Sequence, residues 1–304
     1  MNAQAAVHDA VPRTVVFLGP SLPLPAARRL CTADYRPPVQ MGDVYRAVQD
    51  GARLIVIIDG LFERIPAVWH KEILHAISRG ATVIGGGSMG ALRAAELHPF
   101  GMIGIGAIYE DFAAGVLTDD DEVAVAHAMA DAGYQPTSTA MVNLRRGLQA
   151  ATAAGIIDPQ TADRLIARAK ALFYPERSWD ALLADAATLA PETHAALADY
   201  IAAHQPDQKR DDAIAVLTTA AAMQARLPAP ATGFSFEHTV YWEAIESYCG
   251  HMADPAQAAP AVPFERVRNH VRLFEPDRER LTERALLLFL AEQEARRLRL
   301  PPPD

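Results

Sequence analysis

Cysteine is nearly absent from the chain, since only Cys31 and Cys249 occur among 304 residues. Two thiols so far apart in sequence exclude a multi-cysteine zinc site and a framework of several disulfides. A lone cysteine can carry sulfur as a persulfide, or it can be a small buried hydrophobic residue. The sequence leaves both interpretations open.

Long apolar runs and an excess of positive charge are also missing. No run reaches the ~20 apolar residues that a membrane-spanning helix needs, and residues 1–13, which we expect to be disordered, lack the features of a signal peptide. The formal net charge of -9 disfavours electrostatic binding to nucleic acid or anionic lipid. We therefore expect a cytoplasmic protein whose partners are peptides or proteins, with no nucleic acid and no membrane.

Short β-branched apolar runs are present and are typical of parallel strands covered on both faces. They lie at 14–18 (TVVFL), 54–58 (LIVII) and 81–84 (ATVI), with a further strand expected within 104–109. Helical patterns alternate with them at 25–30, 43–49, 66–78 and 89–97. This alternation predicts an α/β fold with a parallel βαβ sheet.

From about residue 113 the strand pattern stops and alanine-rich helical segments follow. Helices are expected at 120–132, 138–154, 159–173, 179–189, 192–203 and 276–300. The segments 228–230 and 255–263 are proline-rich and are typical of linkers. We predict an α/β core at 14–132 and, after a boundary near Gly133 and Pro136, a helical domain at 133–304 that serves for docking a partner.

The turn GGGSMG follows the third strand and precedes a helix. Gly86, Ser88 and Gly90 match the G-x-S-x-G pattern, in which a sharp strand-to-helix turn crowds both glycines and exposes the serine at the sheet edge. Ser88 is therefore a candidate nucleophile at the positive end of a helix dipole. The alternatives are a glycine turn with Ser88 as an ordinary N-cap, or an anion-binding turn.

An oxyanion formed at Ser88 needs N–H donors nearby. The candidates are the N–H groups of the turn itself, at Gly87 and Met89, and those of the loop after the first strand, at Gly19 and Ser21. Both loops follow strands, and the carboxyl ends of parallel strands share one edge of the sheet.

A nucleophilic serine also needs a base. His70 is the first candidate, because a helix beginning at Pro66 would place it about one turn below the sheet edge and pointing inward. Lys71 offers a serine–lysine arrangement or an oxyanion clamp, and Asp59 could orient His70 or accept a proton. The structural alternatives are a core histidine, a solvated lysine and a plain Asp-Gly turn.

Two charged groups elsewhere are interpreted as structural. Arg93 and Glu96 form a spaced pair on one helix. The acidic run 118–122 suggests a metal site with His127, but acidic residues at a helix start complement the dipole, and capping is the better account. We expect no metal and no cofactor on this chain.

Seven segments in order resemble the TfuA-like family over roughly residues 14–130. They are VFLGPSL (16–22), MGDVYRA (41–47), IIDGLF (57–62), HKEIL (70–74), SMGALRAAEL (88–97), GMIGIGAIY (101–109) and DDEVAVAH (120–127). One departure is Gly87, which stands where many members have a serine. The resemblance does not extend over the helical half.

The resemblance implies a partner role beside a YcaO enzyme, which activates a peptide backbone amide with ATP. Such pairs install a thioamide on a ribosomally synthesised peptide or on a glycine of methyl-coenzyme M reductase, and the TfuA-like subunit recruits or releases the sulfur. The expected partners are a YcaO-family protein, the precursor peptide and a ubiquitin-like sulfur carrier or other sulfur donor.

Three hypotheses follow from the residues and the resemblance together. In the first, Ser88 attacks the C-terminal thiocarboxylate of the carrier and expels hydrosulfide. In the second, the chain is an adaptor without chemistry, whose glycine turn grips a carboxylate or phosphate. In the third, it is an independent serine hydrolase that acts on small esters.

Overall fold

The computed structural model describes residues 12–63, 65–229 and 233–251, together with residues 280, 283, 284 and 287. The chain forms two compact units, Met1–Phe236 and Glu237–Asp304. Most of the segment expected to be disordered at 1–13, the linker at 255–263 and nearly all of the helix expected at 276–300 lie outside the described residues.

A parallel sheet of five strands forms the centre of the first unit. The strands are β1 (Thr14–Phe17), β2 (Asp34–Arg36), β3 (Leu54–Ile57), β4 (Thr82–Gly85) and β5 (Ile103–Gly104), in the order β2-β1-β3-β4-β5. The order in which the strands are added to the sheet therefore reverses between β1 and β3. In open α/β sheets, ligands bind at such a switch point, outside the carboxyl ends of the strands.

Helices surround the sheet and then continue without further strands among the described residues. They are α1 (Leu24–Leu30), α2 (Asp43–Gln49), α3 (His70–Ser78), α4 (Met89–Leu97), α5 (Ala107–Ala113), α6 (Met141–Ala153), α7 (Pro159–Ala171), α8 (Trp179–Asp185), α9 (Pro191–His204) and α10 (Gln208–Ala225), with α11 (Val240–His251) in the second unit. The predicted α/β fold with a helical C-terminal region is confirmed.

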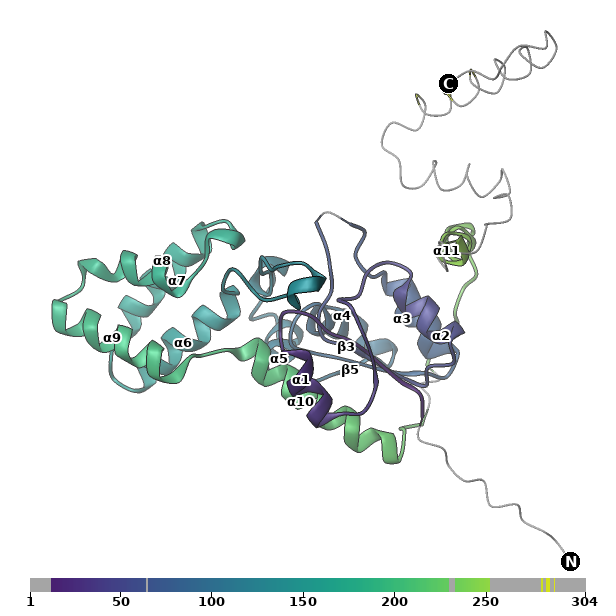
Figure 1. The fold of residues 1–304 in the computed structure, drawn as a ribbon, viewed down its shortest axis with the longest axis horizontal. Helices are drawn as coiled ribbons and strands as arrows, with labels where there is room; N and C mark the ends of the chain where they lie inside the picture. The colour runs from purple at the N-terminus through teal and green to yellow at the C-terminus, as the bar shows by residue number, and fades with distance from the viewer. Residues whose placement is uncertain are drawn as a thin grey trace, which may run out of the picture. The chain divides into compact units, whose positions relative to one another are not determined.

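Alternating side chains of the buried strands supply two separate apolar layers. Val15 and Phe17 of β1 pack with α2, α3 and α4, whereas Val16 packs with α1 and α10 on the opposite face. Helices α6 to α9 form a cluster of their own around Leu144, and Figure 1 shows them gathered together, away from α2 and α3.

Helix α10 belongs to the helical half in sequence but covers the sheet in space. Its residues Ala213, Val216 and Leu217 are fully buried against the strands. The buried carboxylate of Asp212 also accepts hydrogen bonds from the N–H groups of Ala107 and Ile108, at 3.1 and 2.8 Å, and so anchors α10 to the start of α5. The domain boundary near residue 132 stays a prediction, but the sheet depends on a helix that lies beyond it.

Two expected elements differ from the structure. The further strand expected within 104–109 exists as β5, but it is only Ile103–Gly104, and α5 begins after Gly106, whose φ is +100°. The segment 120–132 is not an α-helix and holds only two 3-10 turns, Asp120–Glu122 and Ala130–Ala132. Its acidic side chains are held by basic side chains from other elements, as described below. None of the helices in the described residues is long and apolar enough to cross a bilayer.

Candidate active site

The glycine turn after β4 is as crowded as the pattern requires. A Cβ atom on Gly90 would lie 1.8 Å from the carbonyl oxygen of Ile57, and one on Gly86 would lie 2.2 Å from that of Ile105. Both positions therefore exclude any side chain. Gly87 has a φ of +74°, a conformation that favours glycine. These glycines place Ser88 at the start of α4.

Ser88 is not an ordinary N-cap. Its hydroxyl makes no capping hydrogen bond with the α4 backbone. Instead, the Nζ atom of Lys209 donates to Ser88 Oγ at 2.9 Å, and the same Nζ donates to the carbonyl oxygen of Val123 at 2.7 Å. A serine hydroxyl and a lysine amine from positions 121 residues apart are thus in direct contact.

Lys209 occupies a position that favours its neutral form. Its side chain is only 3% exposed, and Ser88 only 7%. Burial lowers the pKa of the Lys209 ammonium, while the negative charges of Asp59 and Asp207 oppose that shift. A lysine with a lowered pKa can accept a proton from a serine, as in serine–lysine variants of the catalytic triad.

The start of α10 is fixed by a buried asparagine. Asn143 of α6 accepts a hydrogen bond from the Lys209 backbone N–H at 3.1 Å and donates to the carboxylate of Asp207 at 2.8 Å. Asp207 in turn caps α10 by accepting from the Arg210 N–H at 3.1 Å. Lys209 is therefore anchored at both its backbone and its amine.

Asp59 lies at the carboxyl end of β3 and is 1% exposed. Its carboxylate accepts hydrogen bonds from the N–H groups of Gly19 and Ser21, at 2.9 and 3.1 Å, and from the Ser21 hydroxyl at 2.6 Å. It does not orient His70. Its negative charge acts on Lys209 instead and stabilises an ammonium there.

The two predicted bases do not contact Ser88. Helix α3 begins at His70 rather than at Pro66, because Trp69 is still extended, so the expectation of an inward histidine is wrong. His70 is exposed, and its Nε2 lies 2.7 Å from the carboxylate of Glu96. The ammonium of Lys71 lies over the ring of Phe236, 4.6 Å from its centroid.

Two of the predicted oxyanion donors are also occupied by another partner. The N–H groups of Gly19 and Ser21 already donate to Asp59, so they do not serve an oxyanion at Ser88. The Gly90 N–H donates to the carbonyl of Ile58 at 3.2 Å. The Met89 N–H is the first of α4 and has no acceptor within its own helix, so it stays a candidate donor. The Gly87 N–H also stays a prediction.

A cavity of about 520 Å³ opens onto the serine–lysine pair. Its walls come from the loop after β3, at 59–63 and Ile65, and from Val123, 125–127 and Met129. Ser88 and Lys209 both line it, together with Tyr174 of the helical part, which donates to Glu63 at 2.5 Å. This space therefore gives a substrate access to Ser88.

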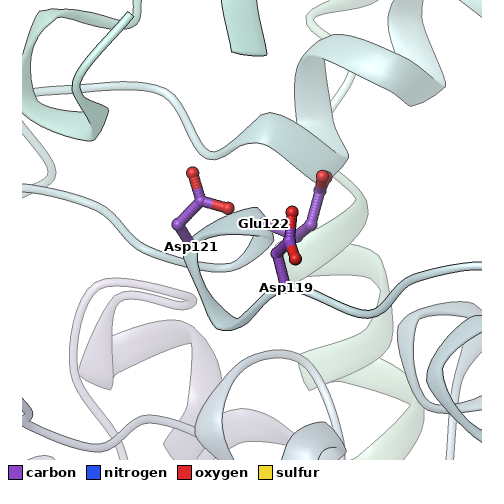
Figure 2. Close-up of side chains that lie close together, drawn as sticks. All are labelled: Asp119, Asp121 and Glu122. Carbon is purple, nitrogen blue, oxygen red and sulfur yellow. The ribbon is translucent and has the colours of Figure 1, made fainter. Parts of the chain in front are cut away.

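The acidic run is an ion-pair cluster rather than a helix cap. Asp119, Asp121 and Glu122 turn their carboxylates toward one region, as Figure 2 shows. The Lys170 ammonium contacts all three, with distances of 3.0 Å to Asp119 and 2.9 Å to Glu122, and Arg145 makes two 2.8 Å hydrogen bonds to Glu122. The Lys170 ammonium thus lies among the carboxylates, where a metal ion would bind. The ion pairs and hydrogen bonds with Lys170, Arg145 and Arg177 lower the pKa values of Asp121 and Glu122.

The remaining sequence interpretations are structural. Arg93 and Glu96 form the expected pair at 2.7 Å. The Nδ1 atom of His127 donates to the carbonyl oxygen of Ala128 at 2.8 Å, and His127 lines the cavity without joining the acidic cluster. Cys31 and Cys249 are both buried, and burial raises the pKa of the Cys31 thiol, which disfavours the thiolate needed for sulfur transfer.

Lys209 is the residue that sequence reasoning missed. One signal was available: a lysine at the second position of a helix is placed against the helix dipole, which favours acidic residues there. The signal was hidden because α10 itself was not predicted.

The fold and the site define a doubly wound α/β protein with a buried serine–lysine pair at the carboxyl edge of its sheet. Residues 59–178 match the model of the TfuA-like protein family, and this part of the chain is a TfuA-like region. The family predicted from the sequence is thereby confirmed. The match includes Ser88 but ends before Lys209. A search of curated proteins finds no match for the chain.

Proposed function

We propose that this protein is the partner of a YcaO enzyme in backbone thioamide formation on a ribosomally synthesised peptide, and that it releases hydrosulfide from the thiocarboxylate of a sulfur carrier. The family match supports the pathway. The 2.9 Å contact between Ser88 Oγ and Lys209 Nζ supports the chemistry. The ATP is used by the YcaO partner, and this chain needs no cofactor.

The first half-reaction is acyl transfer to Ser88. The neutral Lys209 amine takes the hydroxyl proton as Ser88 Oγ bonds to the thiocarboxylate carbon. The C–S bond then breaks, and the proton passes from Lys209 to the leaving sulfur, which departs as hydrosulfide. The transient oxyanion faces the Met89 N–H at the positive end of α4.

The second half-reaction restores the serine. Water attacks the acyl-serine ester, Lys209 takes the proton of the water, and Ser88 regains its hydrogen as the carrier carboxylate leaves. The serine hydrogen comes back from Lys209, and the second hydrogen of the water is released as a proton. The net products are one hydrosulfide, one carboxylate and one proton for each thiocarboxylate and water consumed. The Val123 carbonyl holds the amine in place throughout.

The test measures sulfide from a purified, C-terminally thiocarboxylated ubiquitin-like carrier. We expect Ser88→Ala and Lys209→Met to lower the rate by on the order of 10³-fold, because each removes a partner of the proton transfer. His70→Ala and Lys71→Met are the matched controls and should retain the wild-type rate, since both side chains are held elsewhere. Wild-type sulfide release by Ser88→Ala would exclude the catalytic role.

A second candidate is an adaptor that binds the carrier without reacting. The Lys209 ammonium next to the start of α4 is a pair of groups suited to a carboxylate, which favours this alternative. In that case Lys209→Met weakens carrier binding, measured by calorimetry, while the sulfide yield of the complete YcaO reaction is unchanged by Ser88→Ala. An independent esterase instead hydrolyses nitrophenyl esters without any partner protein.

A further inference from the structure

The chain between the acidic cluster and α6 folds back on itself as a short hairpin. The Thr137 N–H donates to the Ala126 carbonyl at 2.7 Å, and the Ala128 N–H donates to the Gln135 carbonyl at 2.8 Å. The Ala126 N–H also donates to Ser138 Oγ at 2.9 Å. Ala126 and Ala128 therefore use their backbone groups inside the hairpin.

The residues that alternate with these two direct their backbone groups out of the hairpin, because successive residues of a strand turn their N–H and C=O groups to opposite sides. His127 lies opposite Pro136 in the antiparallel pairing, with no backbone hydrogen bond between the two. In the part of the chain that the structure describes, the N–H and C=O groups of Val125 and His127 make no backbone hydrogen bond. We call these four groups the open edge.

Pro136 weakens the other edge of the hairpin. Proline has no N–H to offer to an added strand, which is why it is typical of sheet edges that stay unpaired. Of the two residues that face each other across the hairpin, only His127 has an outward donor. An extended chain is therefore better bound on the side of the open edge.

The open edge begins beside the reactive pair. The Val123 carbonyl accepts from the Lys209 amine at 2.7 Å, and Val123 is only 2% exposed. Met129, at the other end of the segment, is 78% exposed. Both residues of the open edge line the cavity that contains Ser88. The segment thus runs from the buried amine out to the surface.

The proposed reaction sets the direction of a chain bound there. The carbon that reacts is the C-terminal end of the carrier, and it has to reach Ser88, next to Lys209. A tail that follows the open edge therefore enters at Met129 and ends near Val123. It runs antiparallel to residues 125–129.

We propose that the open edge binds the C-terminal tail of the sulfur carrier as an added antiparallel strand, through main-chain hydrogen bonds. The ligand class is an extended peptide, recognised by its backbone rather than by particular side chains. This inference rests on the proposed function and names the part of the partner that enters the site.

The first test removes one donor of the open edge. His127→Pro lacks the N–H, whereas His127→Ala keeps it and loses the same ring, so the difference between these variants measures the donor. Ala130→Pro is the control, because it places an exposed proline at the first position of the 3-10 turn Ala130–Ala132, where proline is tolerated. The measurement is kcat/KM for the thiocarboxylated carrier and for thioacetate, which has no tail.

We expect the ratio of carrier to thioacetate kcat/KM to be on the order of tenfold lower in His127→Pro than in His127→Ala, because the tail loses a hydrogen bond and meets the proline ring. Ala130→Pro should keep the wild-type ratio. An equal ratio in the two His127 variants would overturn the inference.

The second test leaves the protein unaltered, so it does not depend on the folding of a variant. Synthetic peptides with the sequence of the carrier tail and a free carboxylate carry one N-methyl group each, at successive amides, and their binding is measured by calorimetry. In an added strand every second amide faces the edge, so N-methylation should weaken binding by on the order of tenfold at alternate positions only. Any pattern without this alternation contradicts strand addition.

Failure of the proposed function has a separate signature. Sulfide release would then be equal in the wild type and in Ser88→Ala, whereas the binding of the tail peptides is measured without turnover.

Discussion

At the scale of single residues, the proposed chemistry depends on the protonation state of one lysine. Burial lowers the pKa of Lys209 from the ordinary 10.5, because the ammonium loses the solvation of water. The Val123 carbonyl accepts one hydrogen of the amine, which turns the nitrogen toward Ser88. An Arg cannot replace it, since a guanidinium does not give up its proton in proteins.

This predicts a rising pH dependence of sulfide release. Only the neutral amine accepts the serine proton, so kcat/KM should increase with pH and then reach a plateau. The midpoint of this rise should lie below pH 10.5. The measurement is kcat/KM for thioacetate across the pH range in which the protein stays folded. Lys209→Met should show a low rate without that rise, and a wild-type profile that falls with pH would contradict the base role.

At the scale of elements, a buried carboxyl group joins two helix starts. Glu72 of α3 accepts hydrogen bonds from the N–H groups of Gly42 at 2.8 Å, Tyr45 at 3.4 Å and Trp69 at 3.3 Å. Its side chain is fully buried, and this burial raises the pKa of Glu72 to about 7, although the three N–H groups oppose the shift. Glu72 thus fixes the start of α3 at His70 and holds it to α2.

A pH-dependent stability follows from Glu72. The folded state keeps the proton that the unfolded chain loses near pH 4.5, so the stabilisation is complete below 4.5 and is lost as the pH rises to about 7. Over this window the free energy of unfolding should fall by on the order of 2–3 kcal/mol. Urea unfolding of wild type and Glu72→Gln tests this: the variant should be less stable at pH 4.5 but should lack this decrease.

Whether each strand or helix could be predicted from the sequence has a physical cause. Strands β1, β3 and β4 and helices α2 and α4 were predicted nearly to the residue, because apolar periodicity and glycine or proline boundaries are local properties. The start of α3, the segment 120–132 and α10 were not. Each is set by contacts distant in sequence, such as those of Glu72 with Gly42, Lys170 with the acidic cluster, and Asp212 with α5.

At the scale of the first unit, Arg177 connects the helical cluster to the reactive pair. Its side chain is 2% exposed and donates to the Asp121 carboxylate at 2.5 Å and to the Asp121 carbonyl at 3.0 Å. It also donates to the carbonyls of Ala169 and Leu172, both at 3.1 Å. Asp121 lies two residues before Val123, whose carbonyl holds the Lys209 amine. The helical cluster therefore positions the proposed base.

Removal of this connection should affect stability and rate together. Arg177→Met leaves several buried acceptors without a donor, and we expect a loss of about 3 kcal/mol or more in the free energy of unfolding. At a temperature where the variant is folded, sulfide release should fall because Val123 is less well held. Arg168→Met, at an exposed position of α7, is the control and should change neither. A destabilised variant with the wild-type rate would separate Arg177 from the reactive pair.

The sequence by itself determined the sheet, the glycine turn and the position of Ser88, since these depend on short-range periodicity and on the space around glycine. Its motifs in the α/β part also predicted the TfuA-like match that covers residues 59–178. Only the tertiary structure decided which side chain meets Ser88, because His70 and Lys71 are near it in sequence but face other partners. Lys209 is 121 residues away and reaches the serine only once α10 has packed on the sheet. A proton transfer requires contact in space, and separation along the chain does not predict contact.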